Sequence, residues 1–141
     1  MSDPVEFLDL DDVIGVARRL LGDPPPIRDA GLLGSAVARP QTTISAEDAY
    51  PTLWLEAAAL LQSTVANHAL IDGDKRVGWL ATAVFLEING ASVANAADDD
   101  VDELVMAVAS SSSNIGEVAE QLEQLHEPLR WNMRFRTGVR G

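Results

Sequence analysis

Cysteine is absent from the chain of 141 residues, which excludes disulfide bonds and thiol chemistry and fits a reducing compartment. The N-terminal segment lacks a basic stretch followed by an apolar one, so we expect no signal peptide. The apolar runs are too short and too interrupted to span a bilayer. These absences predict a soluble, cytoplasmic protein, and 47% apolar residues at this length suit one globular domain.

Basic residues are scarce and unevenly placed. The chain holds 10 of them against 22 acidic residues, which gives a net charge of -12. Four of the 10 follow the last acidic residue, Glu127, so residues 1–128 keep 6 basic residues beside all 22 acidic ones. Such a body repels nucleic acid and anionic membranes, and we expect neither as a direct partner. Residues 129–141 form a basic C-terminal tail that is solvated, folds back on the acidic body, or touches a polyanion.

Helical periodicity and capping signals account for almost the whole chain. Apolar residues recur at helical spacing between capping residues and terminal Gly or Pro. We expect helices over residues 8–22, 30–40, 52–70, 75–90, 101–111 (behind an acidic cap at 98–100) and 115–125. The segment 75–90 is apolar nearly all round and is expected to be central and buried. Strand signals are weak, and residues 41–51 form a loop or a small hairpin, so the predicted class is all-α.

The stretch HALIDGDKR, which begins at His68, concentrates charge at the joint between two of these helices. His68 ends the first helix, and Gly73 lies where the second begins with unpaired backbone N–H groups. A helix N-terminus attracts phosphate, and Lys75 and Arg76 add donors there. Asp72 beside a phosphate suggests a magnesium ion that bridges the two. These residue types predict a magnesium–nucleotide site with His68 as the general base.

A purely structural explanation accounts for the same stretch. Asp72 to Asp74 could form a turn and an N-cap. Lys75 and Arg76 could belong to a solvated helix face, and His68 could be a surface side chain. No glycine pattern of the P-loop type supports the nucleotide hypothesis. No cluster of His and Cys residues typical of a zinc site is evident either. The residue types alone leave both explanations open.

The stretch resembles the motif of the Fic/Doc family, His-Pro-Phe-any-Asp/Glu-Gly/Ala-Asn-Gly/Lys-Arg. Residues 27–41, IRDAGLLGSAVARPQ, look like the family segment before the motif. Residues 84–93, VFLEINGASV, look like the family segment after it. The resemblance covers about residues 5–125. It implies a compact helical bundle with a small flap hairpin or loop, and it makes residues 1–128 a Fic/Doc domain.

The resemblance implies a role for each matching position. His68 matches the general base and Arg76 the arginine that grips phosphate, and these two are the implied catalytic residues. Asp72 matches the acid that binds magnesium, so ATP and Mg²⁺ are the implied cofactors. The remaining phosphate-binding positions are Gly73, Asp74 and Lys75. The implied flap, to which a target strand adds by backbone pairing, comprises Pro40, Gln41, Thr42, Thr43, Ile44 and Ser45.

Three positions depart from the family pattern. Ala69 replaces Pro, and Leu70 replaces a Phe that anchors the loop in the core. Because Leu70 is also apolar, we expect it to anchor the loop as well, although it fills the space less completely. Asp74 replaces Asn and sets a second negative charge next to phosphate. At an effective dielectric near 20, like charges about 4 Å apart repel by roughly 4 kcal/mol. Unless a second metal or added protein contacts offset this repulsion, nucleotide affinity falls and the enzyme is impaired.

Three functions remain open. The first is a Doc-type toxin that moves the terminal phosphate of ATP to a protein hydroxyl, with elongation factor Tu as the implied target, and blocks translation. Lys75 favours it, because adenylyl transferases of the family typically have glycine there. The second is such an adenylyl transferase (AMPylation), and the third is a non-catalytic binding module, which Asp74 favours. No inhibitory motif of the family is evident in the chain, which places restraint in a partner antitoxin.

The remaining tryptophans and the second histidine are given no catalytic role. Trp54 and Trp79 lie on apolar helix faces and are expected in the core. His126 is expected on the surface near a helix end. Trp131 lies in the basic tail, where it docks on the body or on a partner.

Overall fold

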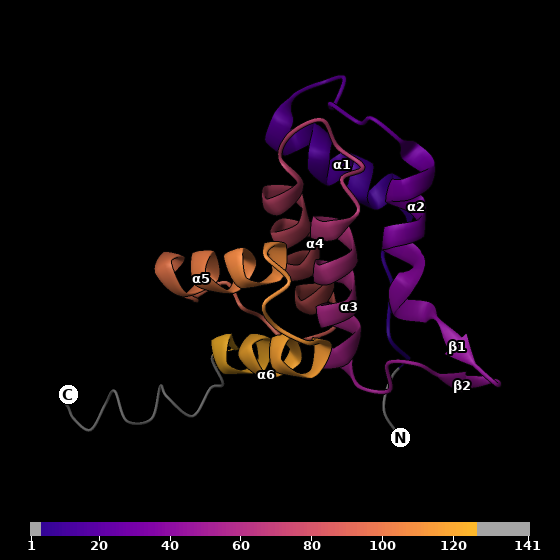
Figure 1. Cartoon of the computed structure of the whole chain (residues 1–141), viewed down its shortest axis with the longest axis vertical. Coiled ribbons are helices and arrows are strands. Elements are labelled where there is room, and N and C mark those ends of the chain that lie inside the picture. The colour runs from indigo at the N-terminus through magenta and orange to yellow at the C-terminus, as the bar shows by residue number, and fades with distance from the viewer. Residues whose placement is uncertain (1–3, 127–141) are drawn as a thin grey trace.

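Six α-helices, a short 3-10 helix and a two-stranded hairpin make up residues 4–126, the part of the chain that the computed structural model describes (Figure 1). The helices are α1 (Leu10–Leu21), α2 (Ala30–Ala38), η1 (Arg39–Gln41), α3 (Leu53–Ala66), α4 (Asp74–Ile88), α5 (Asp98–Ala109) and α6 (Ile115–Leu125). The strands are β1 (Thr43–Ile44) and β2 (Glu47–Asp48). The predicted all-α class is confirmed, whereas the predicted basic tail, Trp131 included, lies outside the described residues.

Reciprocal side-chain caps explain where the first and last of these helices begin. In α1 the Asp9 carboxylate accepts the Asp12 backbone N–H at 2.8 Å, and the Asp12 carboxylate accepts the Asp9 N–H at 2.9 Å. Asn114 and Glu117 form the same arrangement at α6, with both bonds at 2.9 Å. Each of these reciprocal pairs is a capping box, which satisfies two backbone donors that the helix itself leaves unpaired. The capping signals of the sequence therefore predict the start of α6 correctly, whereas α1 begins at Leu10 and not at residue 8 as expected.

Helix α3 lies at the centre of the bundle and contacts α2, α4, α5 and α6 (Figure 1). Three consecutive alanines, Ala57 to Ala59, are fully buried, because side chains this small let neighbouring helices approach on several sides. Helix α4 approaches α3 closely at Gly78, where an added Cβ would lie 2.8 Å from Cγ2 of Val65. A larger residue there would push α3 and α4 apart.

Helix α4 buries one face and exposes the other. Phe85 is 1% exposed and its ring stacks on that of Phe7, with 5.9 Å between centroids. Ile88 in the last turn is 45% exposed. The prediction that this segment would be the central buried helix is therefore only half right, since α3 takes that place. Trp54 and Trp79 pack against the core while remaining half-buried.

The hairpin resolves the open prediction for residues 41–51. Strands β1 and β2 pair antiparallel in the register Thr43 to Asp48 and Ile44 to Glu47. Ser45 joins them in the left-handed region with φ of +54°, followed by Ala46 at +67°, as a tight two-residue turn requires. All four paired residues are exposed, so the hairpin projects from the bundle (Figure 1).

Three further expectations need correction. Helix α3 ends at Ala66 and not at residue 70, so His68 follows the helix in a left-handed conformation. The acidic residues 98–100 were expected to cap α5, but they form its first turn and the N-cap is Ala97. Their negative charges interact favourably with the positive end of the helix dipole. His126 is half-buried, because its Nδ1 bonds the Ser92 carbonyl at 2.8 Å and its ring lies 5.6 Å from that of Trp54. None of the described helices is long and apolar enough to cross a membrane.

Candidate active site

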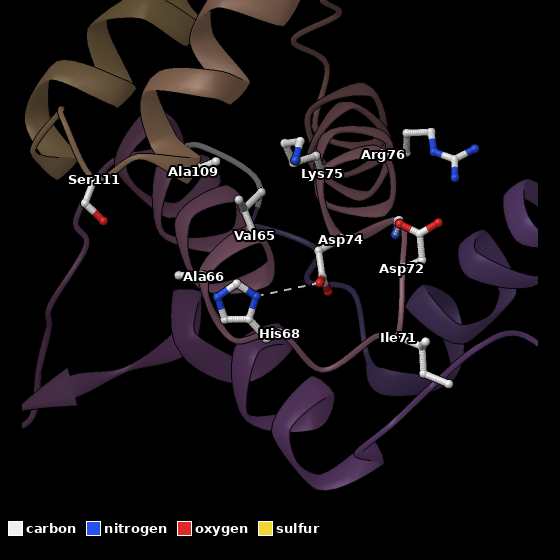
Figure 2. Close-up of a pocket in the computed structure, with 11 residues that line it drawn as sticks. Val65, Ala66, His68, Ile71, Asp72, Asp74, Lys75, Arg76, Ala109 and Ser111 are labelled. Carbon is white, nitrogen blue, oxygen red and sulfur yellow. Dashed lines mark hydrogen bonds and ion pairs between the residues drawn. The ribbon is translucent and has the colours of Figure 1, made fainter.

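A pocket of about 360 Å³ opens at the start of α4 and is bordered by the ends of α3 and α5 (Figure 2). The end of α3 contributes Val65 and Ala66, and the α5 end contributes Ala109 and Ser111. The charged stretch supplies most of the remaining wall: His68, Asp72, Gly73, Asp74, Lys75 and Arg76. The predicted catalytic, phosphate-binding and metal-binding residues are therefore brought together around one cavity, whereas the predicted flap is not part of it.

The loop between α3 and α4, residues 67–73, is called the motif loop below, and two buried side chains hold it. Ala69 and Leu70 are each 1% exposed. Leu70 thus anchors the loop in the core, as expected for an apolar replacement of the larger aromatic residue. His68 and Ile71, on either side of this anchor, are exposed. Burial at the middle of the loop fixes the positions from which the polar side chains project.

Two residues with positive φ shape this loop. His68 has φ of +53°, a conformation that histidine adopts more readily than most residues with a side chain. Gly73 has φ of +90°, and an added Cβ would lie 2.7 Å from Cδ1 of Leu21 on α1. Glycine is needed at position 73 both for the backbone conformation and for the close approach to α1.

The first turn of α4 suits an anion. Gly73 is the N-cap, and no side chain in the described part of the chain caps the helix. The first N–H groups of a helix have no helical partner, and the dipole favours negative charge there. Lys75 and Arg76 are exposed in this turn, and Asp72 accepts the Gly73 N–H through Oδ1 at 2.9 Å. The first turn of α4 therefore combines free backbone donors with two exposed cations, which together favour an anion.

Asp74 turns back toward the motif loop. Its Oδ1 accepts the Leu70 N–H at 3.2 Å, and its Oδ2 lies 4.0 Å from Nδ1 of His68 (Figure 2). The Asp74 side chain is 17% exposed, whereas that of His68 is 75% exposed. The carboxylate that sequence analysis assigned to the phosphate site thus supports the loop and faces the imidazole.

Comparison with known proteins identifies the family of the chain. The sequence profile of the Fic/DOC family matches residues 7–86, more than half of the chain and all of the motif loop. The chain belongs to the Fic/Doc family. A relative named Toxin Doc, from Mycolicibacterium smegmatis, is 48% identical over 120 residues, which cover 83% of this chain and 91% of the relative. The predicted family is confirmed.

The Fic/Doc motif of this chain offers few ligands for a divalent cation. Within residues 4–126 there is no group of three His, Cys, Asp or Glu side chains that could hold a metal ion. Magnesium is commonly bound through one or two carboxylates together with substrate phosphates and water. The exposed carboxylate of Asp72, next to an uncapped helix start, fits an ion that arrives with a nucleotide.

A second pocket of about 540 Å³ adjoins the first. The two share Ala66 and Ser111, and the second is also lined by Arg39 and Thr42. Thr42 belongs to the predicted flap of the Fic/Doc fold, residues 40–45, and leads directly into the exposed strand β1. The flap therefore borders a cavity that continues the motif pocket, although none of its residues lines the motif pocket itself.

Sequence reasoning missed two residues of this Fic/Doc chain. Glu56 on α3 is 7% exposed, and burial, with a further contribution from the Asp48 carboxylate, raises its pKa to about 7. A single acid among the apolar residues of 53–61 was the available signal. Arg28 donates hydrogen bonds to carbonyls of the motif loop 40 residues away in the chain, which no local pattern reveals.

Proposed function

We propose that this chain is a Doc-type toxin that transfers the terminal phosphate of ATP to a hydroxyl group of a protein, and that it blocks translation through a target such as elongation factor Tu. The relative named Toxin Doc and the lysine at position 75 support this class. The observation that carries the proposal is the convergence of His68, the anion-binding start of α4 and Asp72 on one pocket.

Each motif residue has a place in the proposed reaction. Arg76 and the first backbone N–H groups of α4 hold the phosphates, and arginine suits this because its planar group pairs with two oxygens. Asp72 would hold Mg²⁺, which supplies charge neutralisation between phosphate oxygens when bound. Lys75 adds a further positive charge on the first turn. These contacts orient the terminal phosphorus toward the space in front of His68.

Proton transfer is assigned to His68. The target oxygen forms a bond to the terminal phosphorus, the bond from that phosphorus to the bridging oxygen of ADP breaks, and the imidazole accepts the hydroxyl proton. The Asp74 carboxylate, 4.0 Å from Nδ1, stabilises the imidazolium that results. In this proposal the Asp74 carboxylate repels the phosphates but also stabilises the protonated base, and the second effect offsets part of the first.

The flap supplies the docking place for the target. Strand β1 has an exposed edge, and an extended target segment adds to such an edge by backbone pairing. The residues proposed for it are Pro40, Gln41, Thr42, Thr43, Ile44 and Ser45. The cavity bordered by Thr42 continues into the motif pocket, so a side chain of the docked segment has a path to His68.

Restraint of the toxin is assigned to a separate antitoxin protein, because the chain carries no inhibitory motif of the family. Expression alone is then expected to arrest bacterial growth, and coexpression of the antitoxin to relieve the arrest. A chain that is harmless on its own, in amounts that reach the translation machinery, would contradict the proposal.

One experiment separates the proposed activity from its alternatives. ATP labelled at either the alpha or the gamma phosphate is incubated with the protein, Mg²⁺ and a bacterial translation extract. We expect gamma label on a protein target. Alpha label would indicate adenylyl transfer instead, and no label would favour a binding module impaired by Asp74.

A further inference from the structure

The segment 26–29, ahead of α2, pairs with the motif loop along its backbone. Ile27 and Leu70 form an isolated antiparallel bridge, and the Ile71 N–H donates to the Pro26 carbonyl at 2.8 Å. The N–H groups of Arg28 and of its neighbour at position 29 both donate to the Ala69 carbonyl, at 2.8 and 3.1 Å. This pairing covers residues 69–71 in the middle of the loop and leaves His68 outside.

The side chain of Arg28 reaches His68. Its Nη2 donates to the His68 carbonyl and lies 3.4 Å from the Leu70 carbonyl. Within the described range, no other hydrogen bond to the main chain of His68 occurs. His68 is also the residue with φ of +53°, so the guanidinium holds the loop where its backbone conformation is least favourable.

We infer that Arg28 is a positioning residue for the general base. It fixes the main chain of His68 and so keeps the imidazole directed at the pocket and at Asp74. This inference rests on the proposed function, in which His68 accepts the target proton. Arg28 does not line the motif pocket, so its effect on the reaction passes through His68 and not through contact with nucleotide.

The chemistry of the side chain suits this task. A guanidinium is planar, remains charged, and has five N–H donors in a fixed fork, so one group can bond two carbonyls of a turn. Lysine offers a single point charge on a flexible stem and can replace only part of this geometry. Without Arg28, the buried Ala69 and Leu70 still anchor the loop. We therefore expect the fold to persist while His68 loses its fixed orientation.

Kinetics test the inference with Arg28→Ala, Arg28→Lys and the control Arg19→Ala, which removes an exposed arginine from α1. For Arg28→Ala we expect kcat for gamma-phosphate transfer to fall about 10- to 100-fold, as small misplacements of reacting groups do. In Arg28→Ala, KM for Mg-ATP and the thermal midpoint should stay close to those of the parent. Arg28→Lys should recover part of kcat. The control Arg19→Ala should behave as the parent. An unchanged kcat, or a rise in KM that accounts for the whole loss, would overturn the positioning role.

A spectroscopic test requires no activity. The chain has two histidines, so the ring signals of His68 are read by NMR with His126 as an internal reference. In Arg28→Ala we expect the His68 signals to shift or broaden while those of His126 stay in place. Unchanged His68 signals, or equal changes in both rings, would refute the inference. If the parent transfers no gamma label yet His68 alone responds, the proposed function fails and the positioning by Arg28 stands.

Discussion

The Oδ2 atom of Asp74 lies 4.0 Å from Nδ1 of His68, and the other oxygen of the same carboxylate accepts the Leu70 N–H. One side chain in the first turn of α4 thus ties together the helix, the motif loop and the imidazole. Electrostatic attraction to a proton on His68 and repulsion from phosphate act on the same carboxylate.

Replacement of His68 should remove activity without unfolding the protein. We expect His68→Asn to lower gamma-phosphate transfer by about 10²–10⁴-fold, the usual contribution of a general base. Asparagine is the matched choice, because it tolerates the left-handed backbone that this position adopts. Initial rates with gamma-labelled ATP and a thermal melt by circular dichroism measure the two effects. Full activity in a folded variant would place the base elsewhere.

Asp74→Asn should bind Mg-ATP more tightly and turn over more slowly. The amide keeps an oxygen for the Leu70 N–H, removes the charge that repels phosphate, and can donate to a phosphate oxygen. We expect Kd to fall about tenfold, or roughly 1.4 kcal/mol. The rate at saturation should fall because the imidazolium loses its carboxylate. Calorimetry and kinetics across a magnesium titration test this, and weaker binding at every concentration would instead assign Asp74 to a second metal ion.

Gly73→Ala should destabilise the fold by about 1–3 kcal/mol, because alanine is strained at a φ of +90° and its Cβ would press on Leu21. Gly15→Ala on α1 is the matched control. An added Cβ at that position meets no atom within 4 Å, and alanine in a helix interior is more stable than glycine by about 0.5–1 kcal/mol. Chemical denaturation of both variants gives the comparison. Equal stability changes of the same sign would contradict the structural requirement at Gly73.

Glu56 should make the protein less stable as the pH rises toward neutrality. Its pKa is raised from 4.5 to about 7 by burial and by Asp48, so the folded state binds the proton more tightly than the unfolded chain. The contribution to stability is fully present below about pH 4.5 and declines until the pH passes about 7. We expect Glu56→Gln to stabilise the protein at pH 8 by up to about 3 kcal/mol, and much less at pH 4.5.

The matched control for Glu56 is Glu47→Gln, which neutralises an exposed acid on β2 of the hairpin. Thermal unfolding of the parent and both variants between pH 4.5 and 8 measures the difference. If the parent and Glu56→Gln show the same pH dependence, Glu56 does not carry this proton in the folded state.

The sequence predicts what local chemistry determines. The capping residue Asn114 predicts the start of α6, and the charged stretch from His68 onward predicts the site and identifies the family. The left-handed backbone of His68 was not predictable from periodicity, because it depends on the burial of Leu70 and on Arg28 across 40 residues. The burial of Glu56 likewise depends on how the neighbouring elements pack around α3. The local pattern of residues therefore predicts the types of the elements but does not predict the long-range contacts between them.

The close contact between Gly78 and Val65 also determines how long the motif loop can be. The helices α3 and α4 pack closely there, and at the end of the loop the backbone of Gly73 lies so close to Leu21 that a Cβ would not fit. The gap that residues 67–73 bridge therefore has a constant span. An inserted residue could not be absorbed by sliding either helix, and would bulge into solvent and carry Asp72 out of register with the helix start. We therefore expect the number of residues between His68 and Arg76 to matter to the site as well as their chemical identities.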